Sequence, residues 1–262
     1  LIKAGTWSIS ALGSWATLNG HPSLFIFAFL DATIGGPAFF FITGLSAGFG
    51  YNRSLKLPTQ DQVATFPLLA GLTDPSQIGG ASATPAQALQ SLQEWVLPAQ
   101  GCYWLAAGVQ FTTFELVNSN ALIIVEFGKH FEIAILGLAR ARLPQAGPIT
   151  FAYVELALEI IIDPEDGVVS FTAVLTPNSY VLDPACHLTG GFAFFVWFGS
   201  NQHAGDFVIT LGGYHPYFHK PSWYPDEPVL GFNWQISDQL SISGGAYFAL
   251  TPSCVMAGGS LN

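Results

Sequence analysis

The stretch ITFAYVELALEIIIDPEDGVVSFTAVL (149–175) contains two strand-like segments separated by a turn. Within residues 163–167, Pro164 presets φ for a tight turn and Gly167 supplies a residue that tolerates positive φ. The flanking segments are rich in β-branched and aromatic residues, which favour strands. This stretch therefore predicts an antiparallel hairpin.

Other apolar segments bounded by glycine, proline or asparagine repeat this pattern. They lie at 23–32 and 38–51 around a turn at 35–37, at 121–127 and 131–143 around a turn at 128–130, and at 191–198, 206–214, 230–237 and 239–250. Successive strands joined by short turns imply a meander. We therefore expect a mainly β fold with one large, curved antiparallel meander sheet, either open or barrel-like.

Residues 58–100 interrupt the strands, because they are rich in Gln, Ala, Ser and Pro. Within 84–98, Thr84 is placed as an N-cap and Pro85 at the first helical position, and Pro98 is expected to end the helix. A second helix is expected over 59–72, kinked or ended at Pro67. We thus expect a helical insertion at about 59–98.

This insertion is expected to lie within a single β-rich domain that spans 1–262. The chain begins with Leu, and residues 1–20 carry one lysine and no sustained apolar run, so no signal peptide is visible. We expect the chain to be a fragment of a longer one.

The segment 149–162 alternates between two kinds of side chain. An apolar face, expected to be dry, carries Val154, Leu156, Leu158, Ile160 and Ile162, and an opposite face, expected to be wet, carries Tyr153, Glu155, Ala157 and Glu159. The two glutamates lie four residues apart, or ~13 Å along a strand, which exceeds the ~5–9.5 Å of a glycosidase pair. A solvated strand face is the favoured interpretation.

GGFAFFVWFG (190–199) and SLFIFAFL (23–30) are apolar on both faces. Leaving four such aromatic side chains in water would forgo ~6–12 kcal/mol, which is comparable to the ~5–15 kcal/mol stability of a whole domain. Both faces must therefore be covered: by the helical insertion, by an apolar ligand in a curved sheet, or by another copy, a further segment of a longer chain, or a bilayer.

We expect GGFAFFVWFG to pack one face against the helical insertion and to line an apolar interior with the other. The residues expected to line that interior are Phe25, Phe27, Phe29, Phe192, Phe194, Phe195, Trp197 and Phe198.

The composition excludes several partners. The chain carries 7 Lys+Arg against 17 Asp+Glu, and only 9% of its residues are charged. Nucleic acid requires clustered basic residues, which are missing here. The three cysteines, at 102, 186 and 254, form neither a disulfide framework nor a zinc pattern. The chain also lacks GxSxG, Walker A, HExxH and GxGxxG motifs.

The best metal candidates are His215, His219 and Asp226, in the loop GGYHPYFHKPSWYPDEP. Two prolines hold this loop extended and no cysteine joins the group, so a packed aromatic loop is favoured over a metal site. A hydrolase that uses the loop from His215 to Glu227 is the enzymatic alternative. We expect no cofactor and no bound metal.

Three further segments resemble a family of large bacterial and fungal proteins that is catalogued as a domain of unknown function. They are GDFVITLGGYHPYF (205–218), PDEPVLGFNW (225–234) and GGAYFALTPSCVMAGG (244–259). The resemblance implies no catalytic residues. It does imply that the domain continues beyond Asn262 with further strands.

These observations predict a non-enzymatic β-rich module of a larger exported protein, extracellular or at the cell surface. We expect it to hold a lipid or another apolar small molecule in an apolar interior. The alternative is a structural or self-assembly module whose apolar faces are covered by other copies or by the rest of a longer chain.

Overall fold

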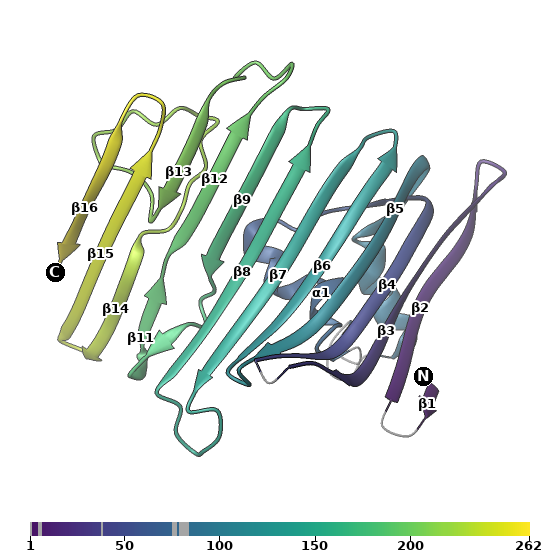
Figure 1. Cartoon of the computed structure of the whole chain (residues 1–262), viewed down its shortest axis with the longest axis horizontal. Coiled ribbons are helices and arrows are strands. Elements are labelled where there is room, and N and C mark those ends of the chain that lie inside the picture. Colours follow the sequence, from purple (N-terminus) through teal and green to yellow (C-terminus); the bar gives the residue numbers. More distant parts are fainter. Residues whose placement is uncertain (1, 5–6, 38, 75–77, 79–83) are drawn as a thin grey trace. The chain divides into compact units, whose positions relative to one another are not determined.

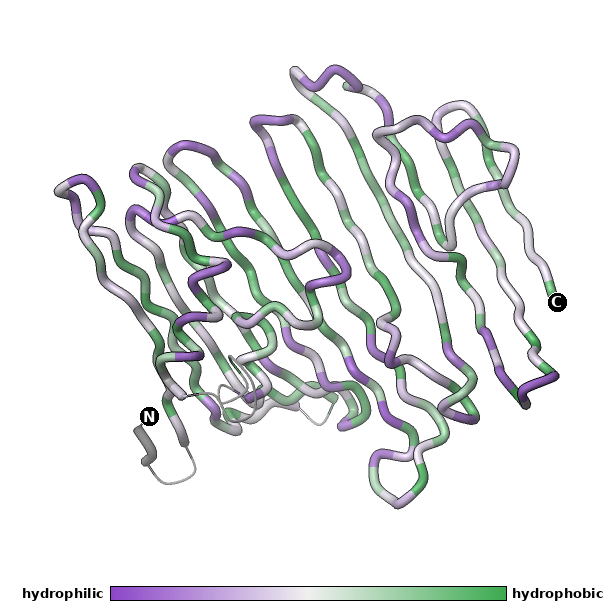
Figure 2. The backbone as a smooth tube through the Cα atoms, turned by 180° about the vertical axis from the view of Figure 1, so that it is seen from behind, coloured by the Kyte–Doolittle hydropathy of each residue, from purple (hydrophilic) through white to green (hydrophobic). Residues whose placement is uncertain are grey.

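A computed structural model describes residues 2–4, 7–37, 39–74, 78 and 84–262 (Figure 1). It confirms a mainly β fold in which the strands pair antiparallel. The chain divides into two compact units, Leu1–Leu138 and Ala139–Asn262. The division falls within β7 (Glu132–Leu143). Along the chain, hydrophilic residues collect mainly in the turns, while the strands are largely hydrophobic or neutral (Figure 2).

The first unit contains a meander in which each strand pairs with the next one in sequence. Its strands are β1 (Ile2–Ala4), β2 (Trp7–Leu18), β3 (His21–Gly35), β4 (Phe40–Leu55), β5 (Val96–Thr113) and β6 (Val117–Gly128). The meander was predicted from the turns, but β2 and most of β5 were not recognised as strands. Serine, glycine and alanine alternate with their larger residues, so the apolar signal in these two strands is weak.

The predicted helical insertion is confirmed between β4 and β5. It consists of the 3-10 helix η1 (Gln60–Thr65) and the helices α1 (Pro67–Ala70) and α2 (Pro85–Gln93). Pro67 separates the first two helices, as expected. The Thr84 side chain accepts a hydrogen bond from the Gln87 backbone N–H, which makes Thr84 the N-cap of α2.

The expected helix end at Pro98 is wrong, because α2 stops at Gln93 and Pro98 lies in β5. Val96 pairs with Leu55 in β4, and its side chain is fully buried. Burial and strand pairing at Val96 thus outweigh the helical pattern of the local sequence.

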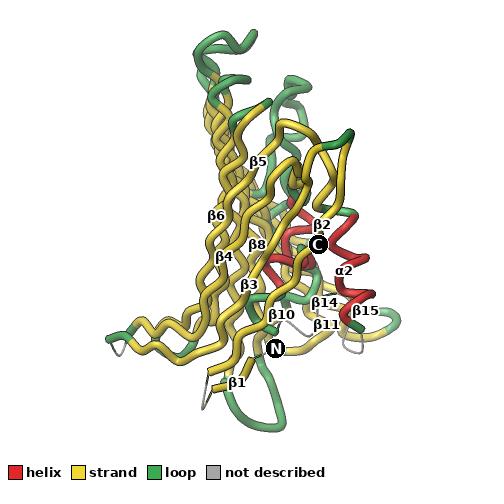
Figure 3. Tube along the Cα trace, turned by 90° about the vertical axis from the view of Figure 1, so that its right-hand side faces the viewer, coloured by secondary structure: helices red, strands yellow, loops and turns green. Residues whose placement is uncertain are grey.

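The helical insertion covers one face of the first unit's sheet (Figure 3). Val63, Leu68 and Leu69 are completely buried there. Asn120 in β6 donates from Nδ2 to the Leu69 carbonyl (3.2 Å) and to Thr73 Oγ1 (2.7 Å). Within the described residues, no helix is long and apolar enough to cross a membrane.

The second unit departs from a simple meander. Its strands are β8 (Ala152–Asp163), β9 (Val168–Leu175), β10 (Tyr180–Val181), β11 (Asp183–Thr189), β12 (Gly191–Trp197), β13 (Phe207–Leu211), β14 (Leu230–Ser237), β15 (Leu240–Leu250) and β16 (Val255–Leu261). The predicted hairpin is confirmed as β8–β9, with Asp163 opposite Val168.

Two rows of shorter strands run between β8 and β15 (Figure 1). One row is β9, β12 and β13, and the other is β10, β11 and β14. The two rows share the ends of the same long strands, because β15 pairs with β14 along Leu240–Ala246 and with β13 along Phe248–Leu250. Between β8 and β15, the sheet of this unit is therefore divided into two sets of shorter strands, each of which pairs with a different end of the long strands.

Candidate functional site

Four cross-strand rows on the side of β2–β6 that faces away from the helices are apolar apart from two tyrosine hydroxyls. Cross-strand partners point to the same side of a sheet, and here they form four rows. The rows are Trp15, Leu24, Tyr51, Tyr103 and Phe127; Gly13, Ile26, Phe49, Leu105 and Val125; Ala11, Ala28, Ala47, Ala107 and Ile123; and Ile9, Leu30, Leu45, Val109 and Ala121. We call this surface the open face.

The open face is accessible to solvent although it carries no charged side chain. Trp15 is 70% exposed and Leu105 is 54% exposed, and seven more of its large side chains are exposed: Ile9, Ile26, Leu45, Phe49, Tyr51, Ile123 and Phe127. With about 200 Å² for each large side chain, nine side chains that are nearly half exposed present roughly 800 Å² of apolar surface. The largest apolar patch of a typical monomer is ~300–600 Å². The exposed apolar area of the open face therefore exceeds that of the largest apolar patch on a typical monomer.

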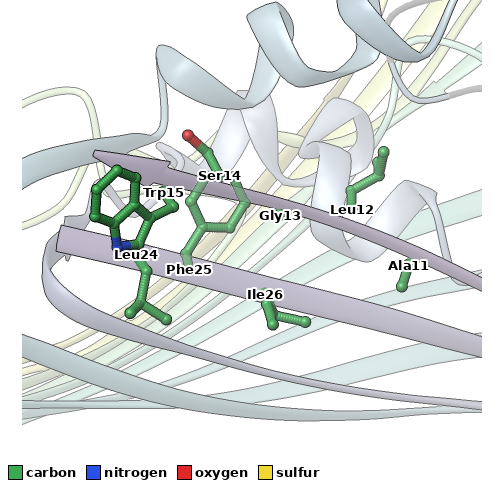
Figure 4. Close-up of a pocket in the computed structure, with 8 residues that line it drawn as sticks. All are labelled: Ala11, Leu12, Gly13, Ser14, Trp15, Leu24, Phe25 and Ile26. Atoms are coloured by element: carbon green, nitrogen blue, oxygen red, sulfur yellow. The ribbon is translucent and has the colours of Figure 1, made fainter. Parts of the chain in front are cut away.

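Three shallow hollows indent the open face. The largest, about 460 Å³, lies along β2 and β3. In Figure 4, Leu12, Ser14 and Phe25 rise from these strands toward the helices, whereas Ala11, Leu24 and Ile26 point to the other side. A second hollow of about 350 Å³ crosses β2 to β5 where the alanines at 28, 47 and 107 lower the surface.

The third hollow, about 320 Å³, lies at the end of the open face that carries the aromatic row. Phe49, Tyr51, Tyr103, Leu105 and Phe127 line it. The Tyr51 and Tyr103 ring centroids are 5.2 Å apart, and those of Tyr103 and Phe127 are 5.6 Å apart. This end of the open face thus combines flat aromatic surfaces with two hydroxyl groups.

The predicted lining residues Phe25, Phe27 and Phe29 lie on the opposite side of β3, beneath the helical insertion, and are at most 3% exposed. Glycines on the neighbouring strands make room for such large side chains. A Cβ at Gly50, for example, would lie 2.1 Å from Trp104 Nε1. These phenylalanines are part of a close-packed core.

In the second unit the apolar side of the sheet is again the more open one. Three cross-strand rows form it: Leu158, Ala173, Phe192, Leu211, Phe248 and Ala257; Ile160, Phe171, Phe194, Ile209, Leu250 and Val255; and Ile162, Val169, Val196 and Phe207. Most of these side chains are half-buried by one another, as in the pair of Phe171 and Phe192, whose ring centroids are 5.2 Å apart.

The expectation of a dry and a wet face on 149–162 is therefore wrong. Glu155 is 5% exposed and Ala157 is 1% exposed, although both were assigned to the wet face. Small residues on this side, such as Ala193 and Ala249, allow neighbouring segments to approach closely, and both are completely buried.

GGFAFFVWFG forms β12, and its two faces have different surroundings. Phe192 and Phe194 lie on the half-buried apolar side, whereas Phe195 and Trp197 lie on the other side. Trp197 is covered by Tyr224, with ring centroids 5.7 Å apart, rather than by the helical insertion as we expected. Phe198 follows the strand and is 36% exposed.

The Tyr224 ring is held in place by hydrogen bonds that its loop makes to the start of β13. Its hydroxyl donates to Asp206 Oδ1 (2.8 Å), and Trp223 Nε1 donates to the other oxygen of the same carboxylate (3.0 Å). Burial, together with the hydrogen bond to Asp206, raises the pKa of the Tyr224 hydroxyl far above its ordinary value. This carboxylate therefore serves to close the loop over Trp197.

The Glu155 carboxylate of the second unit accepts hydrogen bonds from four side chains. Its Oε2 accepts hydrogen bonds from Arg140 Nε (2.7 Å) and from the Tyr153 hydroxyl (3.1 Å). Its Oε1 accepts from the Thr176 hydroxyl (2.8 Å) and from Asn178 Nδ2 (3.1 Å). Burial alone raises the pKa of the carboxyl, but the bonds from Arg140 and from the segment 176–179 outweigh it and lower the pKa. With four donors engaged, Glu155 anchors the chain where it leaves β9.

Glu126 is a half-buried carboxyl of the first unit. It lies opposite Trp104, on the helix-covered side of the sheet, and accepts a hydrogen bond from the Leu55 backbone N–H (3.0 Å). Burial raises the pKa of Glu126 to about 7, because the single backbone hydrogen bond offsets only part of the desolvation.

The metal candidates of the loop after β13 do not come together. Among the described residues, His215, His219 and Asp226 form no set of three closely spaced ligand atoms. Asp226 instead pairs with Lys220 (3.1 Å), and His215 Nδ1 accepts a hydrogen bond from the Tyr217 backbone N–H (3.2 Å). The three cysteines are free of disulfides.

The family model described as DUF6603, a family of unknown function, matches residues 1–262. The chain belongs to the DUF6603 family. No curated protein matches the sequence at a significant level. Membership in DUF6603 confirms the resemblance to a family of unknown function, and it assigns no activity to any residue of this chain.

The open face of this DUF6603 chain was not predicted from the sequence, because the apolar residues were assigned to faces within each strand separately. The signal was present in YWLAAGV (103–109), where Tyr103, Leu105, Ala107 and Val109 alternate with residues of the helix-covered side. Only the register across five strands shows that these side chains continue one surface.

Proposed function

We propose that the chain binds lipid-like apolar molecules on the open face of β2–β6, without catalysing a reaction. The observation that carries this proposal is the exposure of about 800 Å² of uncharged apolar surface on one side of a sheet whose other side is already covered. Covering this surface completely corresponds to ~20 kcal/mol of hydrophobic free energy, at ~25 cal/mol per Å². That exceeds the ~5–15 kcal/mol by which a typical domain is stable.

The shape of the surface also favours an apolar ligand. The hollows of about 350 and 460 Å³ fall within the ~300–1,000 Å³ range of small-molecule sites. The side chains that line them on the open face are aliphatic or aromatic, so they offer close contact to a hydrocarbon chain and few hydrogen bonds to a polar ligand.

A second candidate function is self-assembly, with the open face covered by another copy of the chain. The size of the surface favours it, because a standard protein interface buries ~800 Å² on each partner. Two such sheets can pack face to face at ~10 Å.

The variant Leu105→Asp tests the proposal, because it places a charge at the centre of the open face, where the side chain is 54% exposed and aspartate can be accommodated without breaking the core. Ile149→Asp is the matched control, since Ile149 is 62% exposed in the loop between β7 and β8. Native mass spectrometry with organic extraction then reports what the chain carries.

A lipid-sized adduct on a monomer, lost in Leu105→Asp and retained in Ile149→Asp, is the expected result. Dimers or larger species without any adduct, dissociated by the same variant, would instead establish self-assembly. An adduct-free monomer that gains nothing from added phospholipid would refute both candidate functions.

A further inference from the structure

The aromatic hollow at one end of the open face differs in chemistry from the rest of that surface. Rings of Phe49, Tyr51, Tyr103 and Phe127 line a space of about 320 Å³. Their neighbours along the open face are the aliphatic residues of the remaining rows. The hollow therefore offers a cluster of π-systems beside an aliphatic surface.

Aromatic ring faces attract cations, and quaternary ammonium groups are a frequent ligand of clustered Tyr, Trp and Phe rings. No acidic or basic side chain belongs to the open face, so nothing on it forms an ion pair with a charged ligand. A weakly hydrated cation fits this hollow better than a carboxylate or a phosphate does.

The strands that form the hollow also provide a path for an apolar tail. On β5, Leu105, Ala107 and Val109 follow Tyr103 on the same side, ~6.6 Å apart along the strand. Val125, Ile123 and Ala121 follow Phe127 in the same way on β6. A molecule with a cationic head in the hollow thus extends its chain over the aliphatic rows.

We propose that the aromatic hollow binds the quaternary ammonium group of a choline phospholipid, whose acyl chains lie along β5 and β6. This inference rests on the proposed function and names the lipid class. The aromatic hollow recognises the head group, and the aliphatic rows recognise the chains.

The test compares dodecylphosphocholine with dodecylphosphoethanolamine, below their micelle concentrations, by calorimetric titration of the full chain. The two probes share the same chain and differ in the three methyl groups on nitrogen, so the comparison isolates the quaternary ammonium. We expect the phosphocholine probe to bind about tenfold more tightly.

The variants separate ring chemistry from apolar area. Tyr103→Leu keeps an apolar side chain but removes the ring, and is expected to abolish the preference for the phosphocholine probe while both probes still bind. Tyr103→Phe keeps the ring and is expected to retain the preference. Urea unfolding of each variant checks that the fold is preserved.

Equal affinities of the unaltered chain for the two probes would overturn the choline assignment and leave apolar binding in place. A preference that survives in Tyr103→Leu would also overturn it. Failure of both probes to bind would overturn the proposed function as well, so the two failures are distinguishable.

Discussion

Replacing Glu155 by glutamine removes the charge that holds the segment 176–179 against β8. The amide oxygen of glutamine can still accept the bonds from Thr176 and Asn178, which are 2.8 and 3.1 Å long in the native chain. Its NH₂ group, however, then faces Arg140 Nε, which can only donate, whereas the Tyr153 hydroxyl can turn and accept a hydrogen bond from it. The variant therefore loses the ion pair without losing side-chain volume.

The expected loss follows from the burial of the two partners. Removing one member of a buried ion pair costs ~3–5 kcal/mol, but a partner that reaches water recovers part of that cost. The Glu155 side chain is 6% exposed and that of Arg140 is 27% exposed, so the guanidinium can be partly solvated after the change. We expect Glu155→Gln to lower the free energy of unfolding by about 2–3 kcal/mol.

Urea unfolding followed by tryptophan fluorescence at neutral pH measures this change. Asp238→Asn, in the exposed turn between β14 and β15, is the control, and is expected to stay within ~0.5 kcal/mol of the native chain. A Glu155→Gln curve that coincides with this control would refute the anchoring role of the carboxylate.

The same variant makes a pH prediction. Because the folded-state pKa of Glu155 lies below its ordinary value, its stabilisation is complete above the unfolded pKa of ~4.3 and is lost as pH falls through the folded pKa. The difference in stability between the native chain and Glu155→Gln is therefore expected to shrink in acid. A difference that stays constant under acidic conditions would contradict the assignment.

Three further changes have defined outcomes. Glu126 has its pKa raised to about 7, so its contribution to the free energy of unfolding is most favourable in acid and is lost as pH rises toward 7. Glu126→Gln is expected to flatten this pH dependence in urea unfolding between pH 5 and pH 8. An unchanged dependence of the unfolding free energy on pH would contradict the raised pKa. Gly50→Ala places a methyl group against the fully buried Trp104 and is expected to lower the free energy of unfolding by ~1–3 kcal/mol. A thermal unfolding curve equal to that of the native chain would show that the core rearranges around the methyl group at little cost. Tyr224→Phe removes the hydroxyl that donates to Asp206 and is expected to cost ~1–2 kcal/mol and to increase hydrogen exchange of the loop; protection equal to that of the native chain would exclude the loop-closing role.

The hairpin at 149–175 and the helical insertion were predictable because their signals are local. Pro164 and Gly167 specify a turn by their own backbone preferences, and Thr84 and Pro85 specify a helix start in the same way. Such signals act over a few residues and need no knowledge of the rest of the chain.

The split of the second unit's sheet was not predictable on the same basis. It depends on β9 pairing with β12 rather than with the next strand, and on Glu155 holding the segment between β9 and β10. Both depend on contacts between residues 17 to 29 positions apart, which leave no periodic pattern in the sequence.

By itself, the sequence determined that the chain is mainly β, that its strands follow one another through tight turns, and that several strands are apolar on both sides. Alternation along a strand separates two faces but does not say which one is covered, because the two-residue period of the side chains is the same whichever face is buried. Only the tertiary structure decided that the helices cover Phe25, Phe27 and Phe29 and leave Ile26 and Leu105 open. The reason is physical: burial is a property of what lies opposite a side chain in space, and the register of five strands turns residues far apart in sequence into one apolar surface.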